Sequence, residues 1–182
     1  MRIIAGTFRS RQLKMVPSRD TRETSDKVKG AVFNSIGFRI ENSVVLDLFA
    51  GSGSYGLEAI SRGAKHVVFN DYKQIAIQTL SENIRNLSVE NVCDIWKLDY
   101  EVALKKIENL DYKFDLVFID PPYKLDIYED IVNQLYTHTS EDVMIVLEMD
   151  KSRILNSSKL INYLIYKEKV YGSKKIIFIM KQ

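Results

Sequence analysis

Apolar and polar residues follow two alternating patterns between residues 43 and 165. Short apolar runs, typical of buried strands, are each followed by a segment whose apolar residues recur at helical spacing. The apolar runs are 43–49, 65–71, 92–99, 114–120 and 143–149, and the helical segments are 54–63, 73–87, 100–110, 127–139 and 154–165. Strands that alternate with helices and are apolar throughout predict an α/β fold, in which helices cover both faces of a parallel sheet.

The first 40 residues depart from this alternation. Two β-type stretches, 2–5 and 12–16, flank the sequence GTFRSR and predict a hairpin. After a polar loop, the sequence TSDKVKGAVFNSIGF (24–38) has apolar residues at helical spacing, and Ser25 and its neighbours are candidate N-caps. We therefore expect a small hairpin and helix, residues 1–39, appended to a main domain over residues 40–182.

The carboxyl-terminal segment KEKVYGSKKIIFIM (167–180) also departs from the alternation. It reads as two strands that turn back at Gly172-Ser173 and predicts a closing hairpin. Together with the five apolar runs, the hairpin predicts a mostly parallel, seven-stranded sheet that contains one antiparallel strand.

The composition suits one compact domain with a small appendage. The chain has 182 residues, of which 46% are hydrophobic, enough for a full core. Its longest apolar runs fall short of the roughly 18–20 residues that a membrane helix needs, and no signal segment opens the chain. The single cysteine, Cys93, and two distant histidines argue against a disulfide framework and a zinc site. We expect a cytoplasmic monomer that needs no metal.

Acidic residues gather where the predicted strands end. The strand ends read DLFAGSG (47–53), ND (70–71), LD (98–99), DPPY (120–123) and EMD (148–150). In parallel sheets, ligands bind at the carboxyl ends of the strands, so these ends are the predicted site. Glu148 also has a plainer interpretation, which is an ion pair with a nearby lysine.

The first strand end continues as DLFAGSGSYG (47–56), with glycines in G-x-G-x-x-G spacing. In dinucleotide loops, glycines at this spacing bring the backbone close to a ligand at a helix N-terminus. Gly51 and Gly53 would do so here, whereas Gly56 has a second interpretation, which is close packing of the helix on the sheet. The spacing alone does not identify the ligand.

Two details argue against a pyrophosphate at this loop. Phe49 and Ala50 separate the strand from the first glycine, and the Asp47 carboxylate would repel a nearby phosphate. A cationic ligand without phosphate fits better. S-adenosylmethionine meets that requirement, because it carries an ammonium and a sulfonium. A nicotinamide enzyme is correspondingly disfavoured.

The next two strand ends supply acceptors for the same cofactor. Asp71 follows Gly51 by twenty residues and would accept hydrogen bonds from both ribose hydroxyls. Asp99 would accept from the adenine amino group, or else it caps the helix predicted over 100–110. The neighbouring Phe49, Ala50 and Tyr72 complete the set of candidate cofactor-binding residues.

The fourth strand end is the unusual corner Asp120-Pro121-Pro122-Tyr123. The prolines fix two φ angles and remove two backbone donors, while their carbonyls remain acceptors. The Asp120 carboxylate and the Pro121 carbonyl would hold both N–H bonds of a planar amine whose ring stacks on Tyr123. This corner predicts transfer of a methyl group to an aromatic amine held in line, without a metal. The alternative is a simple proline turn before a capped helix.

Several segments together resemble the RsmD family of bacterial methyltransferases. They are MRIIAGTFRSRQLK (1–14), DTRETSDKVKGAVFN (20–34), VLDLFAGSGSYGLEAISRGA (45–64), FDLVFIDPPY (114–123) and KVYGSKKIIFI (169–179). The resemblance implies a Rossmann-like class I fold, S-adenosylmethionine as cofactor, and methylation of a guanine N2 in 16S rRNA. The implied target is guanine 966 in customary numbering, within a 30S subunit or an assembly intermediate.

The resemblance also assigns roles by position. Asp47, Gly51, Gly53, Asp71 and Asp99 match the cofactor-binding positions, and the Asp-Pro-Pro-Tyr corner matches the catalytic motif. The chain departs from the family pattern at Ser10, Glu23 and Gly30, where Gly, Pro and Glu are usual. These departures concern RNA contacts rather than the methyl-transfer site.

The net charge of +2 hides an asymmetry that agrees with an RNA substrate. Residues 1–39 hold nine Lys and Arg against three acids, whereas the rest of the chain holds 17 against 21. Such an excess is either a solvated face or a polyanion-binding arm, and the resemblance favours the arm. The candidate phosphate contacts are Arg2, Arg9, Arg11, Lys14 and Arg22. Arg9 and Arg11 flank Ser10 and would share one face if this segment is extended.

Three activities remain open at this point. The first is guanine-N2 methylation of 16S rRNA. The second is methylation of DNA adenine N6, cytosine N4 or another RNA, because the same corner serves any aromatic amine. The third is an inactive RNA-binding assembly factor. The short chain has no visible target-recognition insert, which favours the first activity, and the intact acids and prolines argue against the third.

Overall fold

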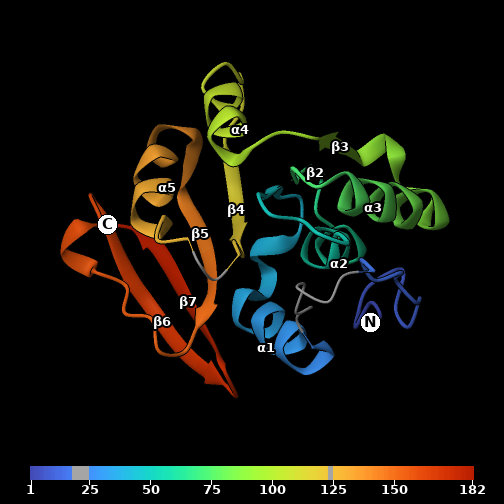
Figure 1. Cartoon of the computed structure of the whole chain (residues 1–182), viewed down its shortest axis with the longest axis horizontal. Helices are drawn as coiled ribbons and strands as arrows, with labels where there is room; N and C mark the ends of the chain where they lie inside the picture. The colour runs from blue at the N-terminus through green and yellow to red at the C-terminus, as the bar shows by residue number, and fades with distance from the viewer. Residues whose placement is uncertain (18–24, 123–124) are drawn as a thin grey trace.

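A mixed sheet and five α-helices make up most of the computed structural model, which describes residues 1–17, 25–122 and 125–182 (Figure 1). The strands are β1 (Val44–Asp47), β2 (His66–Asn70), β3 (Cys93–Trp96), β4 (Phe114–Ile119), β5 (Thr139–Asp150), β6 (Tyr163–Tyr171) and β7 (Lys174–Lys181). The helices are α1 (Asp26–Ile36), α2 (Ser54–Ser61), α3 (Gln74–Leu87), α4 (Tyr100–Ile107) and α5 (Tyr128–Gln134). Short 3₁₀ turns are η1 (Gly37–Ile40), η2 (Glu90–Val92), η3 (Tyr136–His138) and η4 (Ser157–Lys159).

The sheet has the order β3-β2-β1-β4-β5-β7-β6 in the described part of the chain. The pairs from β3 through β5 are parallel, and β7 runs antiparallel to both of its neighbours. The predicted sheet of seven strands with one antiparallel strand is therefore confirmed. The strand order reverses between β1 and β4, which is where ligands bind in sheets of this type.

Consecutive strand residues point to two separate apolar cores. Val45, in the middle of β1, faces the core formed with α1, α2 and α3, whereas Leu46 faces the core formed with α4 and α5. The paired residues on β2 and β4 divide in the same way. Because both faces are covered, the strands are apolar throughout instead of alternating with polar residues.

The amino-terminal hairpin is reduced to a single antiparallel bridge between Arg2 and Gln12. Backbone bonds from Ile3 N to the Arg11 carbonyl and from Leu13 N to the Met1 carbonyl, both 3.0 Å, hold the two stretches together. Ile3 and Leu13 are buried in the core under α1 and α2, so packing rather than strand pairing fixes this segment. The division of the chain at residue 39 stays a prediction.

Helix α1 begins where the sequence indicated. Ser25 is its N-cap, and the Ser25 hydroxyl accepts a 3.3 Å hydrogen bond from Val28 N. Residues 18–24, which include Thr24, one of the neighbours of Ser25 considered as an N-cap from the sequence, lie outside the described residues. Among the residues that the structure describes, no helix combines the length and apolar character that a membrane span requires.

The helix predicted over 154–165 is wrong. Only the 3₁₀ turn η4 forms there, with the Asn156 side chain accepting a bond from Ser158 N at 3.1 Å. From Tyr163 onward the chain belongs to β6, whose pairing partner β7 lies later in the sequence. Of the residues that suggested a helix, 163–165 pair in this hairpin and Leu155 and Leu160 pack in the core, so pairing and packing override local periodicity.

Helix α5 is also shorter than the predicted segment 127–139. It ends at Gln134 and is followed by η3, and β5 already begins at Thr139. The Thr139 hydroxyl, which is buried, donates to the Leu135 carbonyl at 3.2 Å. This bond closes the end of the helical region directly onto the strand.

Candidate active site at the carboxyl ends of the strands

A pocket of about 300 Å³ opens at the carboxyl ends of the first four strands. It is lined by Phe49 after β1, Asn70 and Tyr72 at the end of β2, Leu98, Asp99 and Tyr100 after β3, and Pro122 and Leu125 after β4. The fold thus brings together four residues that the sequence singled out at four separate strand ends: Phe49, Tyr72, Asp99 and Pro122. Its position at the switch point is the one expected for a ligand site in a parallel sheet.

The glycine loop between β1 and α2 requires glycine for close packing. Gly53 has φ +84°, and a Cβ atom there would lie 2.4 Å from Leu80 Cδ1 on α3. At Gly56 a Cβ atom would lie 2.1 Å from Phe69 Cε1, so α2 rests directly on β2. The second interpretation of Gly56, close helix–sheet packing, is therefore confirmed.

Asp47 lies beneath this loop rather than on the pocket wall. Its carboxylate is buried, and Asp47 Oδ2 accepts a 3.0 Å hydrogen bond from Gly56 N in the first turn of α2. Burial raises the pKa of Asp47 to about 7, with the nearby Asp71 adding to the rise and the Gly56 bond opposing it. The structure places Asp47 where it orients the loop, and direct cofactor contact stays a prediction.

Asp71 ties the glycine loop to the end of β2. Asp71 Oδ2 accepts from Gly51 N at 2.9 Å, and Asp71 Oδ1 accepts from Lys73 N at 2.9 Å. A second link runs from Ala50 N to the Asn70 carbonyl at 2.8 Å. A carboxylate has about four acceptor positions, so these two bonds leave Asp71 able to accept from a ligand as well.

Asp99 serves as the N-cap of α4. Asp99 Oδ1 accepts a 3.0 Å hydrogen bond from Glu101 N, and the residue also borders the pocket. The capping interpretation is confirmed, and it is compatible with a second role for the other carboxylate oxygen. Beside it, the rings of Phe49 and Tyr100 are 5.8 Å apart and give the pocket an aromatic side.

Asn70 belongs to the site but was not singled out from the sequence. It is buried on the pocket lining, and Asn70 Nδ2 donates to the carbonyls of Leu48 and Leu98, each at 3.2 Å. Its Oδ1 has no hydrogen-bond partner among the residues that the structure describes. The amide therefore clamps the ends of β1 and β3. The sequence signal for Asn70 is its position at a predicted strand end, immediately before Asp71.

The Asp-Pro-Pro corner begins immediately after β4. Ile119 pairs with Leu147 on β5, so Asp120 and Glu148 follow at neighbouring strand ends. Burial raises the pKa of Asp120 well above its usual range, the Glu148 and Asp47 carboxylates raise it further, and Lys174 opposes the rise. Tyr123, the predicted stacking partner, lies outside the described residues.

Glu148 is the centre of the charged group beside this corner. Its side chain is buried, pairs with Lys174 Nζ, and accepts a 2.8 Å hydrogen bond from the Tyr55 hydroxyl on α2. The predicted pairing of Glu148 with a lysine is thus confirmed. We call Asp47, Asp120, Glu148 and Lys174 the strand-end cluster.

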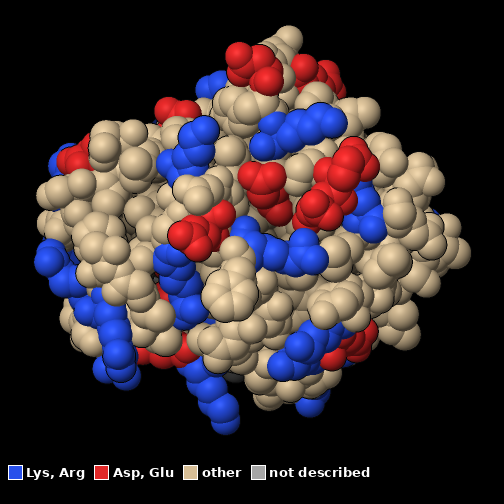
Figure 2. Space-filling model, turned by 180° about the vertical axis from the view of Figure 1, so that it is seen from behind, with Lys and Arg blue, Asp and Glu red and all other residues tan. Residues whose placement is uncertain are grey.

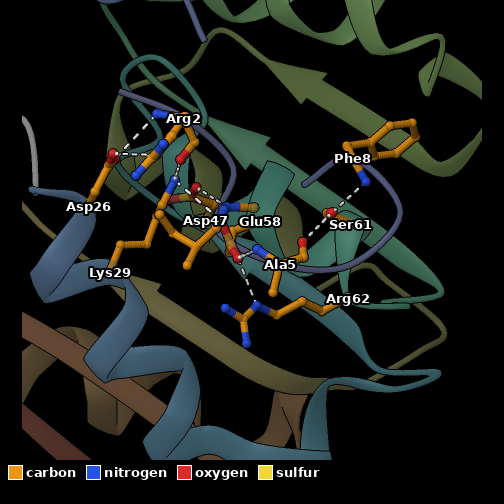
Figure 3. Close-up of polar contacts among 11 residues, drawn as sticks. Arg2, Ala5, Phe8, Asp26, Lys29, Asp47, Glu58, Ser61 and Arg62 are labelled. Atoms are coloured by element: carbon orange, nitrogen blue, oxygen red, sulfur yellow. Dashed lines mark hydrogen bonds and ion pairs between the residues drawn. The ribbon is translucent and has the colours of Figure 1, made fainter. Parts of the chain in front are cut away.

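A second group of buried charges holds the amino-terminal segment on α2 (Figure 3). Glu58 and Lys29 are both fully buried and 3.4 Å apart, and Arg62 Nε donates to Glu58 Oε1 at 2.7 Å. The same carboxylate accepts from Ile4 N at 2.8 Å and Ala5 N at 3.1 Å. We call Lys29, Glu58 and Arg62 the α2 cluster.

Most of the predicted phosphate contacts have protein partners in this structure. Arg2 Nε is 3.3 Å from Asp26 Oδ2, Arg11 Nη2 donates to the Asn86 carbonyl at 2.8 Å, and Lys14 pairs with Glu82. Arg9 is exposed, and Arg22 lies outside the described residues. On the face in Figure 2, Lys and Arg side chains are interspersed with Asp and Glu.

The condition under which Arg9 and Arg11 would share one face, an extended segment, is not met. Ser10 has φ +69°, and residues 6–10 form turns instead. Arg11 N donates to the Phe8 carbonyl at 3.0 Å within this turn. The alternation rule for strands therefore does not apply to these two side chains.

Metal ligands do not gather in the part of the chain that the structure covers. Within residues 1–17, 25–122 and 125–182, no group of three or more His, Cys, Asp and Glu side chains is placed to hold a metal ion.

The strand order, the reversed β7 and the pocket at the carboxyl ends of the strands define a Rossmann-like class I methyltransferase fold. A family model described as "Conserved hypothetical protein 95" matches residues 1–180. The chain belongs to this family, and the RsmD resemblance found in the sequence is confirmed.

Relatives agree with this assignment. The Ribosomal RNA small subunit methyltransferase D of Haemophilus influenzae is 35% identical over 178 residues, covering 94% of this chain and 89% of that protein. A solved structure of a conserved hypothetical protein from Streptococcus pyogenes is 37% identical with a TM-score of 0.78, covering 85% of this chain and 96% of that one. A Thermus thermophilus hypothetical protein is 26% identical with a TM-score of 0.83, covering 99% of both chains.

Proposed function

We propose that this protein transfers a methyl group from S-adenosylmethionine to the exocyclic N2 amine of a guanine in 16S rRNA. The observation that carries the proposal is one pocket that is lined both by Phe49, Tyr72 and Asp99, from the predicted cofactor-binding set, and by Pro122 of the Asp-Pro-Pro corner. A cofactor site and an amine-holding corner are thereby neighbours. The similarity to the Ribosomal RNA small subunit methyltransferase D of Haemophilus influenzae supports small-subunit rRNA as the substrate.

The residues around the pocket fit this cofactor. Asp71 has acceptor positions left beside the loop, the Phe49 and Tyr100 rings offer an aromatic surface, and the buried Asn70 Oδ1 has no partner among the described residues. Asp47 and Asp71 place acidic groups near the loop, which suits a cation better than a phosphate. When bound, the cofactor supplies an electrophilic methyl group.

The corner would hold the amine by two acceptors. The Asp120 carboxylate and the Pro121 carbonyl accept from its two N–H groups, and Tyr123 stacks on the base. Holding both hydrogens favours a pyramidal nitrogen whose lone pair faces the methyl group, so orientation supplies much of the rate. After methyl transfer, the nitrogen is cationic and releases one proton to Asp120 or to water. A carboxylate of raised pKa suits the first route.

The basic amino-terminal segment would bind the RNA backbone. Its candidate phosphate contacts are Arg2, Arg9, Arg11, Lys14 and Arg22. Arg2 and Lys14 would exchange their present carboxylate partners for phosphates. We place the enzyme in the cytoplasm as a monomer acting on guanine 966, in a 30S subunit or an assembly intermediate.

Nucleoside analysis tests the proposal directly. The protein and methyl-labelled cofactor are incubated in three separate reactions, with unmodified 30S subunits, with naked 16S rRNA and with DNA. Label in N2-methylguanosine from either ribosomal substrate is the expected result. Label in N6-methyladenine or N4-methylcytosine would replace the substrate, and RNA binding without any label would favour an inactive assembly factor.

A further inference from the structure

One buried amide joins the predicted RNA-binding segment to the glycine loop. Asn83 lies on α3 with 1% of its surface exposed. Asn83 Oδ1 accepts from Lys14 N at 2.8 Å, and Asn83 Nδ2 donates to the Lys14 carbonyl at 3.0 Å and to the Ser52 carbonyl at 2.9 Å. Both amide protons are used, one toward each segment. Ser52 stands between the two glycines of the loop, so the amide reaches its centre.

The same stretch of α3 contacts both partners through other residues. Leu80 fills the space against Gly53, where a Cβ atom would come within 2.4 Å. Glu82 pairs with Lys14, and the Asn86 carbonyl accepts from Arg11. Residues 80–86 are therefore packed between two segments that the proposed function assigns to different ligands. Two of the predicted phosphate contacts rest directly on this helix.

We propose that Asn83 is a positioning residue that couples RNA binding by residues 1–17 to cofactor binding at the glycine loop. The proposal rests on the function proposed above. The amide can bond both backbones only when both segments hold this arrangement. A ligand that fixes one segment therefore orients the amide for the other, and each ligand strengthens binding of the other by the same factor.

A second set of contacts keeps the amino-terminal segment docked without Asn83. Glu58 accepts from Ile4 N and Ala5 N, and the Ser61 hydroxyl donates to the Ala5 carbonyl at 2.6 Å. Ile3 and Leu13 are buried in the core as well. Loss of the Asn83 amide should thus uncouple the two sites while the segment stays on the protein.

The test measures the dissociation constant of S-adenosylhomocysteine with and without an unmodified 16S rRNA transcript, and that of the transcript with and without S-adenosylhomocysteine. For each ligand, the coupling ratio is its dissociation constant without the other ligand divided by its dissociation constant with it. In the wild type we expect the two coupling ratios to be equal and to lie at roughly 5- to 150-fold. Asn83→Ala should bring both ratios close to 1, while each single-ligand dissociation constant changes by a few-fold.

Thr79→Val is the matched control. Thr79 is buried on the same helix, and among the described residues its hydroxyl bonds the Ile75 carbonyl of that helix alone, so this variant should keep the wild-type ratio. Urea unfolding verifies that the variants fold, and Asn83→Ser replaces Asn83→Ala if the latter does not. The serine hydroxyl is too short to bridge Lys14 and Ser52.

Two results would overturn the inference alone: a wild-type ratio of 1 with both ligands bound, or a wild-type ratio in the folded Asn83 variant. Failure of the wild type to bind S-adenosylhomocysteine, or to bind both the transcript and unmodified 30S subunits, gives a different pattern. That result removes the proposed function, and the coupling falls with it.

Discussion

The α2 cluster and the strand-end cluster are both buried groups of charge, yet they are balanced differently. In the α2 cluster, one carboxylate is surrounded by Lys29, Arg62 and two backbone N–H groups. In the strand-end cluster, as far as the described residues extend, three carboxylates are accompanied by one lysine, and Lys174 pairs with Glu148 and opposes the rise of the Asp120 pKa. The pKa values of Asp47 and Asp120 rise mainly because of burial, and nearby carboxylates add to the rise: Asp71 for Asp47, and Glu148 and Asp47 for Asp120.

A difference of this kind is expected between charges that hold the fold together and charges that take part in catalysis. The α2 cluster satisfies its carboxylate with donors and fastens the amino-terminal segment. Burial lowers the pKa of Lys29, while Glu58 opposes the shift. Carboxylates kept close together with raised pKa values cost stability and are found at catalytic sites, where a proton must be held or moved. Helix α2 serves both groups, because Tyr55 reaches Glu148 and Glu58 holds the amino-terminal segment.

The largest expected effect is on catalysis, from Asp120→Ala. Removing this acceptor should lower kcat by roughly 100- to 10,000-fold, because the amine is no longer oriented and one proton acceptor is lost. Methyl-transfer assays measure kcat, and calorimetry measures the dissociation constant of S-adenosylhomocysteine. That dissociation constant should stay within a few-fold of the wild-type value. Asp115→Asn is the control, since Asp115 lies at the opposite end of β4 and accepts from Val44 N. Near-normal turnover of Asp120→Ala would remove the catalytic role.

The next effect is on stability, from Glu58→Ala. This variant leaves Lys29 buried without its carboxylate and removes the acceptor of Ile4 N and Ala5 N, so the free energy of unfolding should fall by about 3–5 kcal/mol. Urea unfolding measures the change. Glu82→Gln, which breaks the exposed pair with Lys14, should cost less than about 1 kcal/mol. Equal costs for the two variants would contradict the structural role of the α2 cluster.

A pH-dependent effect follows from Asp47. Its pKa is about 7 in the folded protein against 3.8 normally, so folding takes up a proton between about pH 4 and pH 7. Stability therefore falls as pH rises through this window, because the carboxylate ionises in the unfolded chain while the buried carboxyl keeps its proton. Above about pH 7 the buried group ionises as well, and the fall ends. Asp47→Asn has no carboxyl to titrate. The free energy of unfolding of this variant, relative to that of the wild type, should therefore rise by roughly 2–3 kcal/mol between pH 5 and pH 8.

Urea unfolding of the wild type and Asp47→Asn at pH 5, 6.5 and 8 measures that gain. Parallel pH curves for the two proteins would show that Asp47 has an ordinary pKa. The strand-end cluster would then contain one carboxyl group with a raised pKa instead of two, and it would differ less from the α2 cluster.

The smallest expected effect is on RNA affinity, from Arg9→Ala. Arg9 is exposed, so its loss should weaken RNA binding a few-fold and reduce the slope of log affinity against log salt by about 1. Binding of the 16S transcript at several salt concentrations measures both. Lys159→Ala, an exposed change on η4, should leave the slope unchanged. An unchanged slope for Arg9→Ala would exclude a phosphate contact by Arg9.

The sequence predicted the strand-end motifs well because each is local. Asp120 with its two prolines, and the glycines after β1, stand within a few residues of each other, and the strand pattern placed them at one edge of a sheet. Asn83, Lys29 and Glu58 carried no comparable signal. Each is an ordinary helix residue in sequence, and its role depends on partners 27 to 69 residues away.

The amino-acid sequence by itself determined the α/β class, the positions of the sheet-forming segments along the chain and the acids at their ends. Apolar periodicity and turn chemistry act over a few residues and can be read directly. Only the tertiary structure decided that residues 163–165 join β6, that Ser10 turns the basic segment, and which buried charges are balanced. Pairing, burial and electrostatic balance depend on residues distant in sequence, which local patterns do not specify.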